Sequence, residues 1–419
     1  MGRRGGVRAG DGLDMRDLIF LSNGHGEDVV ACKVLDRIRT VRPGLSIAAW
    51  PMVGEGASYS ARGIETVGTR NLLPSAGFAT LDRNLMMRDL QAGWIGTHWN
   101  QFRDARSLRG RYRMAIAVGD IIPIAAGILS RSPFMFIGCA KSSYYNPGHG
   151  YMGIEKRLLR RYCALTFPRD RLTVAELEQA GVPTLYLGNP MMDGLDPAGD
   201  RLGVPEDSIV VGMLAGTRAD AETNLLDLLA AAGRLHRLHP EPSRIRIAFA
   251  ARAELDPREV MTEIVADPRL SDWHVTELSN RPDGAVLRLA GPSGMETVIT
   301  KGRFADILHM SDIVVGMAGT ANEQAIGLGI PLVTAPSSGV QGDQYVKMKM
   351  KFFGESAVAV RREPDAIARA VVDILGDPER QAHMAAAGRE RMGDPGASAA
   401  IADEILKALD RIGPGSAVP

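Results

Sequence analysis

The chain has 419 residues, of which 45% are hydrophobic and 23% charged, and its 49 basic side chains balance its 49 acidic ones. This length predicts two domains or more, and the balanced charge excludes a chain-wide attraction to nucleic acid. No run of about 18 apolar residues predicts a membrane-spanning helix. The three cysteines are scattered, which fits a reducing, cytoplasmic compartment, and neither they nor the histidines form a metal-ligand pattern.

The first strand is predicted at residues 18–21, an apolar run too short for the core of a signal peptide. Residues 1–15, rich in arginine and glycine, are expected to form a disordered tail, as are residues 413–419. A glycine loop at 23–28 follows the run and passes into a helical pattern over 29–39. A strand, a glycine loop and a helix in this order are typical of α/β folds.

Short apolar runs alternate with helical patterns along the rest of the chain. In the first half, strands are predicted at 46–50, 114–118, 134–137 and 185–187, with helices at 154–163 and 172–180. A second series of strands is predicted at 209–214, 245–250, 313–315 and 332–335. This alternation predicts parallel sheets covered by helices on both faces.

A segment rich in turn formers, 188–197, separates the two series. We therefore expect an α/β fold of two Rossmann-like, doubly wound domains over 16–190 and 208–412, joined by a linker at 191–207. The last helix is a candidate to pack back on the N-terminal domain. Residues 277–300 are expected to form a hairpin-like or irregular excursion. Ligands of such sheets bind beyond the carboxyl ends of the strands, so the two domains would face one central cleft.

Two glycine loops of the second half are candidate phosphate sites. Residues 316–325 follow a predicted strand and open a helix, whose first N–H groups favour an anion. The turn Gly216-Thr217-Arg218 adds a hydroxyl and a guanidinium, which suit a diphosphate. The alternatives are a tight connection without a ligand and a helix N-cap by Thr217 beside a solvated Arg218. The chain lacks the P-loop and dinucleotide fingerprints, which disfavours kinases and dehydrogenases.

Three segments resemble lipid-A-disaccharide synthase. They are residues 187–193, residues 214–226 with Gly216-Thr217-Arg218, and residues 311–331 with Gly319-Thr320 and Gly329-Ile330-Pro331. The resemblance covers most of the chain from about Ala115 onward. It implies the two-domain GT-B fold and an inverting, metal-independent transfer of a sugar from a UDP-sugar, with no cofactor besides this substrate.

The loops and the resemblance together predict the donor-binding residues, which are Gly216, Thr217, Arg218, Gly319, Thr320, Asn322, Glu323, Gln324, Gln341 and Gln344. Gln324 stands where the family has a glutamate for the donor ribose, and it keeps an accepting carbonyl without the charge. The family's first-domain loop is replaced by a different acceptor loop, with Asn23, Gly24, Gly26, Glu27 and Asp28 around His25. This favours a related enzyme over the lipid A enzyme itself.

Asp120 follows the predicted strand 114–118, at the edge where cleft residues belong. The resemblance places it on the family's essential aspartate, where it would take the proton of the acceptor hydroxyl. The alternative is an N-cap for the helix that begins at Ile121. His25 is the rival base because its intrinsic pKa is closer to neutral.

Residues 70–113 interleave basic and aromatic side chains, a pattern that suits an anionic membrane surface. The alternative is an apolar face packed in the core with arginines in water. The candidate membrane residues are Arg83, Arg88, Trp94, Trp99, Phe102 and Arg103. We therefore expect a cytoplasmic glycosyltransferase with a UDP-sugar donor and a lipid or lipid-linked acceptor. If residues 70–113 bind a membrane surface, the enzyme would be peripheral on the inner face of the cytoplasmic membrane. The alternatives are a non-hydrolysing UDP-sugar 2-epimerase and a UDP-sugar binder without turnover.

Overall fold

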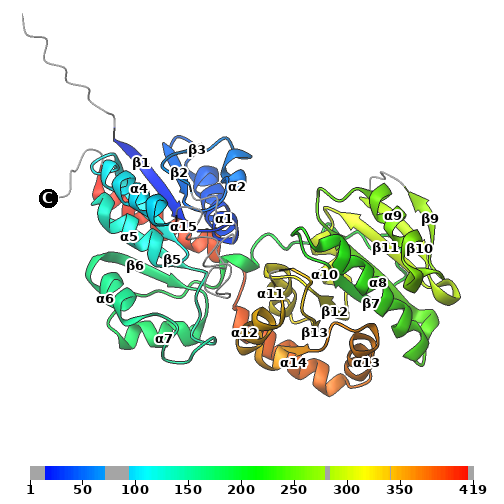
Figure 1. Cartoon of the computed structure of the whole chain (residues 1–419). Helices are drawn as coiled ribbons and strands as arrows, with labels where there is room; N and C mark the ends of the chain where they lie inside the picture. Colours follow the sequence, from blue (N-terminus) through cyan, green and yellow to red (C-terminus); the bar gives the residue numbers. More distant parts are fainter. Residues whose placement is uncertain (1–14, 71–93, 279–283, 340, 414–419) are drawn as a thin grey trace, which may run out of the picture.

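The computed structural model describes residues 15–70, 94–278, 284–339 and 341–413 (Figure 1). Of the expected tails 1–15 and 413–419, all residues except Met15 and Gly413 lie outside the described residues. The described chain forms two sheets covered by helices, and the structure is α/β.

The first sheet consists of six parallel strands in the order β3-β2-β1-β4-β5-β6. Its strands are β1 (Arg16–Ser22), β2 (Ile47–Pro51), β3 (Glu65–Thr66), β4 (Tyr112–Val118), β5 (Phe134–Gly138) and β6 (Cys163–Pro168). Its helices are α1 (His25–Val41), α2 (Ala57–Ser60), α4 (Trp94–Ser107), α5 (Ile121–Ser130), α6 (Gly153–Tyr162) and α7 (Arg171–Gln179). The central strands read as continuous apolar runs because both faces of the sheet are buried, as in β1 with Leu18, Ile19, Phe20 and Leu21.

The second sheet has eight strands in the order β14-β13-β12-β7-β8-β11-β10-β9. Its strands are β7 (Ile209–Leu214), β8 (Ile245–Ala251), β9 (His274–Leu278), β10 (Ala285–Ala290), β11 (Glu296–Lys301), β12 (Ile313–Gly316), β13 (Leu332–Thr334) and β14 (Ala357–Ala359). Near residues 277–300, β10 runs antiparallel to both of its neighbours, β11 and β9, in an otherwise parallel sheet. The helices are α8 (Ala221–Leu238), α9 (Pro257–Ala266), α10 (Phe304–Met310), α11 (Thr320–Gly327), α12 (Asp343–Phe353), α13 (Pro364–Leu375) and α14 (Pro378–Met392).

The last helix, α15 (Ala397–Ile412), packs on the first domain, beside α1 (Figure 1). Its buried face includes Ile401, Ile405 and Leu409, which join the core of the first sheet. Arg113 donates to the carbonyl of Leu409 at 2.9 Å. The first domain is therefore built from both ends of the described chain.

The junction between the domains is a packed segment. Asn189 and the short 3₁₀ helix Pro190–Met192 are buried. Gly188 has φ +94°, and a Cβ there would lie 2.6 Å from the carbonyl oxygen of Asp394, so this position requires glycine. Two expectations differ from the structure. Residues 185–187, predicted as a strand, lie outside the regular strands because the chain turns at Gly188, and Cys163, predicted in a helix, begins β6.

Candidate functional site

The site lies where the carboxyl ends of the strands of both domains meet. The first domain contributes the segments that follow β1, β4, β5 and β6, and the second contributes those that follow β7, β12 and β13. Arg169, directly after β6, forms a salt bridge of 2.5 Å with Glu323 on α11. The two edges therefore face each other, as expected for ligand sites of doubly wound sheets.

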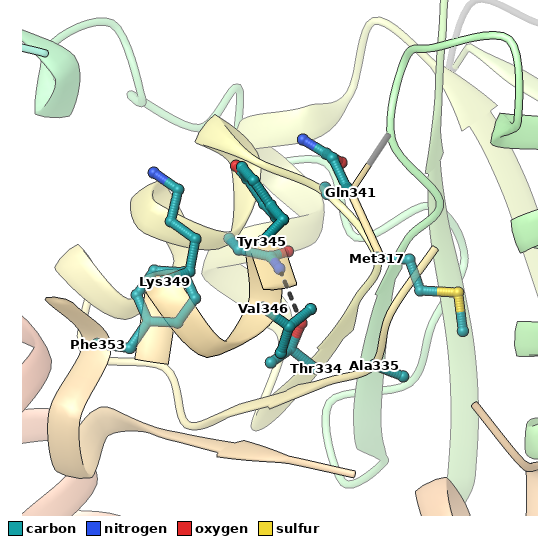
Figure 2. A pocket seen from close by; sticks show the side chains of 10 residues that line it. Met317, Thr334, Ala335, Gln341, Tyr345, Val346, Lys349 and Phe353 are labelled. Atoms are coloured by element: carbon teal, nitrogen blue, oxygen red, sulfur yellow. Dashed lines mark hydrogen bonds between the residues drawn. The ribbon is translucent and has the colours of Figure 1, made fainter. Parts of the chain in front are cut away.

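A pocket opens in the second domain between the end of β12, α11, β13 and α12 (Figure 2). It is lined by Met317, Ala318, Asn322, Thr334, Ala335, Gln341, Tyr345, Val346, Lys349 and Phe353. Two of the predicted donor residues, Asn322 and Gln341, thus reach the pocket. Tyr345 and Lys349 are four residues apart on α12, so their side chains lie on one face of the helix and point into the same space.

The floor of the pocket is a polar cluster at the end of β12. The side chain of Asn322 donates to the carbonyl of Gly316 at 3.1 Å, and the Thr334 hydroxyl donates to the same carbonyl at 2.7 Å. A Cβ on Gly316 would overlap the Asn322 amide, so glycine is required for this packing. The buried Oδ1 atom of Asn322 has no hydrogen-bond donor among the described residues. It is therefore a buried acceptor whose hydrogen-bonding capacity is unused among the described residues.

Gly319 precedes α11 and lies beneath two polar side chains. A Cβ there would lie 2.8 Å from Nε2 of Gln341 and 2.9 Å from the hydroxyl of Tyr345. The missing side chain thus leaves backbone N–H groups at the start of α11 next to these polar groups. Thr320 and Gln344 are exposed at the same end of the domain.

The loop after β7 lies beside the loop after β12. Gly216 has φ +88°, and a Cβ there would contact the carbonyl oxygen of Met317 at 3.4 Å. Helix α8 begins at Ala221, so Thr217, which is exposed, is not its N-cap residue. Burial raises the pKa of Tyr345, while the positive charges of Lys349 and Arg218 oppose that rise, which indicates that Arg218 is near the pocket.

Glu323 and Gln324 point in different directions. The Glu323 carboxylate is buried, pairs with Arg169 at 2.5 Å, and pairs also with Lys349. Burial alone would raise its pKa, but these two cations lower the pKa of Glu323 to about 2. Gln324, placed by the resemblance at the donor ribose, donates instead to the carbonyl of Met191 at the domain junction, at 2.9 Å.

Aromatic rings complete the contact between the domains. Tyr145, in the loop after β5, stacks on Phe352 of α12 with ring centroids 5.3 Å apart, and Lys349 donates to its hydroxyl at 2.8 Å. The Arg169 guanidinium lies 4.5 Å from the centroid of the Phe352 ring. Arg169, Lys349 and Tyr145 were not predicted from the sequence. The signal available for Arg169 was its position after β6, a strand that was itself missed.

Asp120 is held rigidly at the edge of the first domain. It is the N-cap of α5, accepting from the amide of Ile122 at 2.9 Å, and the side-chain amide of Asn23 donates to its two oxygens at 3.1 and 3.0 Å. Burial raises its pKa, and these hydrogen bonds oppose the rise. The N-cap alternative therefore describes the local structure, and the carboxylate lies at the carboxyl edge of the first sheet, directly after β4.

The other members of the acceptor loop divide between the cleft and the core. His25 is exposed as the first residue of α1. Asp28 turns inward, where the Ser22 hydroxyl donates to it at 2.5 Å and lies 2.8 Å from the hydroxyl of Tyr59. Burial raises the pKa of Asp28 to about 7. Glu27 lies between them in sequence and is half-buried. Its carboxyl is within electrostatic range of Lys349 and Glu323 in the second domain.

The candidate membrane patch is only partly described. Arg83 and Arg88 lie outside the described residues, as do the side chains of Trp94 and Trp99 on α4. Phe102, which is 38% exposed, and Arg103 face solvent on this helix. Among the helices that the structure describes, none has the length and hydropathy needed to cross a bilayer.

Comparison with known proteins finds relatives over much of the chain. No family model matches it. It is 24% identical to the UDP-N-acetylglucosamine–N-acetylmuramyl-(pentapeptide) pyrophosphoryl-undecaprenol N-acetylglucosamine transferase of Salinibacter ruber, over 94% of this chain and 97% of that protein. It is 23% identical to lipid-A-disaccharide synthase of Geobacter sulfurreducens, over 59% of this chain. That match covers 62% of the synthase's own length, which is less than two thirds.

Solved structures share the architecture. A calicheamicin glycosyltransferase superposes with a TM-score of 0.58 at 15% identity, over 96% of this chain and all of that one. A putative UDP-N-acetylglucosamine 2-epimerase from Listeria monocytogenes gives a TM-score of 0.56 at 12% identity, again over 96% of this chain and all of the other. At these identities the likeness concerns the fold, which is that of the GT-B proteins expected from the sequence.

Proposed function

We propose that this chain, a GT-B protein related to lipid-A-disaccharide synthase, is a glycosyltransferase that moves a sugar from a UDP-sugar to a lipid or lipid-linked acceptor. The observation that carries the proposal is the polar pocket at the carboxyl edge of the second sheet, facing the carboxylates of the first-domain edge. The names of both sequence relatives supply the reaction class and the lipid-linked acceptor.

The donor is proposed to bind with its nucleotide in the second domain. The polar groups of Gln341 and Tyr345, which line the pocket, suit the hydrogen bonds of a nucleotide, and the N–H groups at Gly319 suit a phosphate. Arg218, near Tyr345, adds positive charge on the same side. These groups would stabilise the charge that develops on the UDP leaving group without a metal ion.

The acceptor is proposed to approach from the first-domain edge and to attack the anomeric carbon directly, which inverts its configuration. The acceptor hydroxyl must lose a proton as the new bond forms. Asp120 and His25 are the candidate bases from the sequence, and both belong to this edge. The hydrogen bonds that fix Asp120 would also orient the loop that carries His25, since Asn23 belongs to that loop.

Peripheral contact with an anionic membrane is supported by helix α6. Three arginines on its outer side, Arg157, Arg160 and Arg161, are exposed. Its acid, Glu155, is buried and bonded to Lys141 at 2.6 Å, so it does not offset them. Met152, Ile154 and Tyr162, which flank or lie on the helix, are 51%, 48% and 52% exposed. Exposed arginines beside exposed apolar groups suit an anionic lipid surface.

The direct test is a donor screen that measures UDP release in the presence of a native membrane lipid extract, with UDP binding followed by calorimetry. We expect UDP to bind and one UDP-sugar to release UDP only when lipid is present. Failure of UDP to bind would refute the proposal. Conversion of UDP-N-acetylglucosamine to its epimer without any acceptor would favour the epimerase, and UDP binding with no turnover of any donor would favour the inactive binder.

A further inference from the structure

Glu27 occupies a space that two glycines leave open. It is the third residue of α1, after the loop that follows β1. A Cβ on Gly24 would overlap its carboxyl oxygen Oε2, and a Cβ on Gly119 would lie 2.9 Å from its Cγ. Gly119 also has φ +119°, a conformation that other residues rarely adopt. The backbone on both sides is therefore shaped to admit the Glu27 side chain next to Asp120.

The carboxylates near this edge differ in what they bind. Asp120 accepts three hydrogen bonds, Asp28 is bonded to Ser22, and Glu323 is paired with two cations. The Glu27 carboxylate has no hydrogen bond or salt bridge to another residue in the part of the chain that the structure describes, and it interacts with its own backbone amide. Its oxygens are therefore available to a substrate.

The surroundings of Glu27 raise the pKa of its carboxyl above that of an ordinary glutamate. Burial is the largest influence and raises the pKa of Glu27. The negative charges of Asp120, after β4, and of Glu323, on α11, act in the same direction, while Lys349 on α12 opposes them. The thiol of Cys139, after β5, also lies within electrostatic range. A carboxylate of raised pKa accepts a proton more effectively than an ordinary one.

On its own helix, the neighbouring charged group is Asp28, whose pKa is itself raised by the charge of Glu27 as well as by burial. His25, two residues earlier, is exposed. On α1, Glu27 is therefore flanked in sequence by Asp28, which is buried, and by His25, which is exposed to solvent.

We infer that Glu27 is the catalytic base of the transfer, a role that rests on the proposed function, and that Asp120 is a positioning residue. The acceptor O–H bond breaks and its proton moves to a carboxyl oxygen of Glu27. The acceptor oxygen forms the new bond to the anomeric carbon of the donor sugar. The bond from that carbon to the β-phosphate oxygen breaks, and its electron pair leaves with UDP. Asp120 holds Asn23 and the start of α5, and thereby the loop that leads into α1, the helix that carries Glu27.

The test compares E27Q with the wild type, using UDP release with donor and lipid extract, UDP affinity by calorimetry, and thermal unfolding. E27Q keeps the size of the side chain and removes its basicity. We expect a loss of kcat of about 100-fold or more, in the range of general base catalysis, with UDP affinity and melting temperature close to those of the wild type. The exposed Glu178 on α7 provides the matched control E178Q, which should leave all three measurements unchanged.

Further variants separate the roles. H25Q, which removes the rival base, should lose less activity than E27Q, and D120N should lose activity together with thermal stability because it weakens the cap of α5. The acid limb of the kcat profile of the wild type should be absent from the residual activity of E27Q. Activity of E27Q within tenfold of the wild type would overturn the assignment while leaving the proposed function intact. Absence of UDP binding by the wild type would overturn the proposed function and the assignment with it.

Discussion

Removal of the Glu323 carboxylate is expected to destabilise the contact between the two domains. Its oxygens pair with Arg169 at 2.5 Å and with Lys349, and the side chains of Arg169 and Glu323 are only 2% and 3% exposed. E323Q would leave two buried cations without their counter-ion. Breaking a buried pair from one side costs about 3–5 kcal/mol, because the remaining charge is left desolvated and unpaired.

The lowered pKa of Glu323 leads to a similar magnitude. A change from 4.5 in the unfolded chain to about 2 in the folded one corresponds to about 3 kcal/mol. Because the folded-state pKa is depressed, this stabilisation is present above pH 4.5 and is lost as the pH falls toward 2. The wild type should therefore lose stability over this interval, and E323Q should lose less over the same interval.

The assay is urea unfolding at pH 7, followed by circular dichroism and by tryptophan fluorescence. We expect E323Q to lower the free energy of unfolding by about 3 kcal/mol or more. The control is R361Q, which removes a salt bridge between side chains that are 85% and 58% exposed and should cost less than about 1 kcal/mol. A loss in E323Q no larger than that in R361Q would refute the assignment of this cluster as a structural link between the domains.

Three further results are expected. G316A should place a methyl group against the Asn322 amide and displace it from the pocket floor, so calorimetry should find UDP affinity lowered about tenfold, and unchanged affinity would contradict the proposed donor pocket. The triple variant R157Q/R160Q/R161Q should bind anionic vesicles about 100-fold more weakly in sedimentation, at about 1 kcal/mol per charge, whereas the second-domain triple variant R361Q/R369Q/R380Q should not. Burial raises the pKa of Asp28 from 3.8 to about 7, so the folded protein becomes less stable relative to the unfolded chain as the pH rises through this range. D28N should therefore raise the melting temperature at pH 8 more than at pH 4. An equal effect at the two pH values would exclude this titration.

Much of the fold could be predicted from the sequence because its signals are local. The apolar runs at 18–21, 114–118 and 313–315 became buried central strands, since strands covered on both faces must be apolar throughout. The lipid-A-disaccharide synthase resemblance is matched by the sequence relatives, and the GT-B fold by the solved structures. Residues 185–187 show the limit of local signals, because an apolar triplet was not sufficient for a strand where the chain turns at Gly188.

The candidate site could be predicted only in part, because its charges are paired across the fold. Arg169 and Glu323 are 154 residues apart in sequence, and nothing near either residue indicates that they meet. Glu323 and Gln324 are adjacent on α11, but adjacent helical residues point about 100° apart. Glu323 therefore pairs with Arg169, whereas Gln324 bonds to the carbonyl of Met191 at the domain junction. At Gly316 and Gly319 a side chain would collide with pocket groups, so the packing explains these glycines, while their role toward a phosphate stays a prediction.

The return of α15 to the first domain has a consequence for how the protein is made. The chain crosses between the domains twice, and the crossings are tied together, since the amide of Asn189 donates to the carbonyl of Asp394 at 3.1 Å and Asp193 accepts from Ser398 at 2.6 Å. The second domain is thus inserted within the first, and during synthesis it is complete before α15 leaves the ribosome. Until then the core of the first sheet lacks Ile401, Ile405 and Leu409. A nascent chain that stops at α14 would therefore carry a finished second domain beside a first domain with an open apolar face.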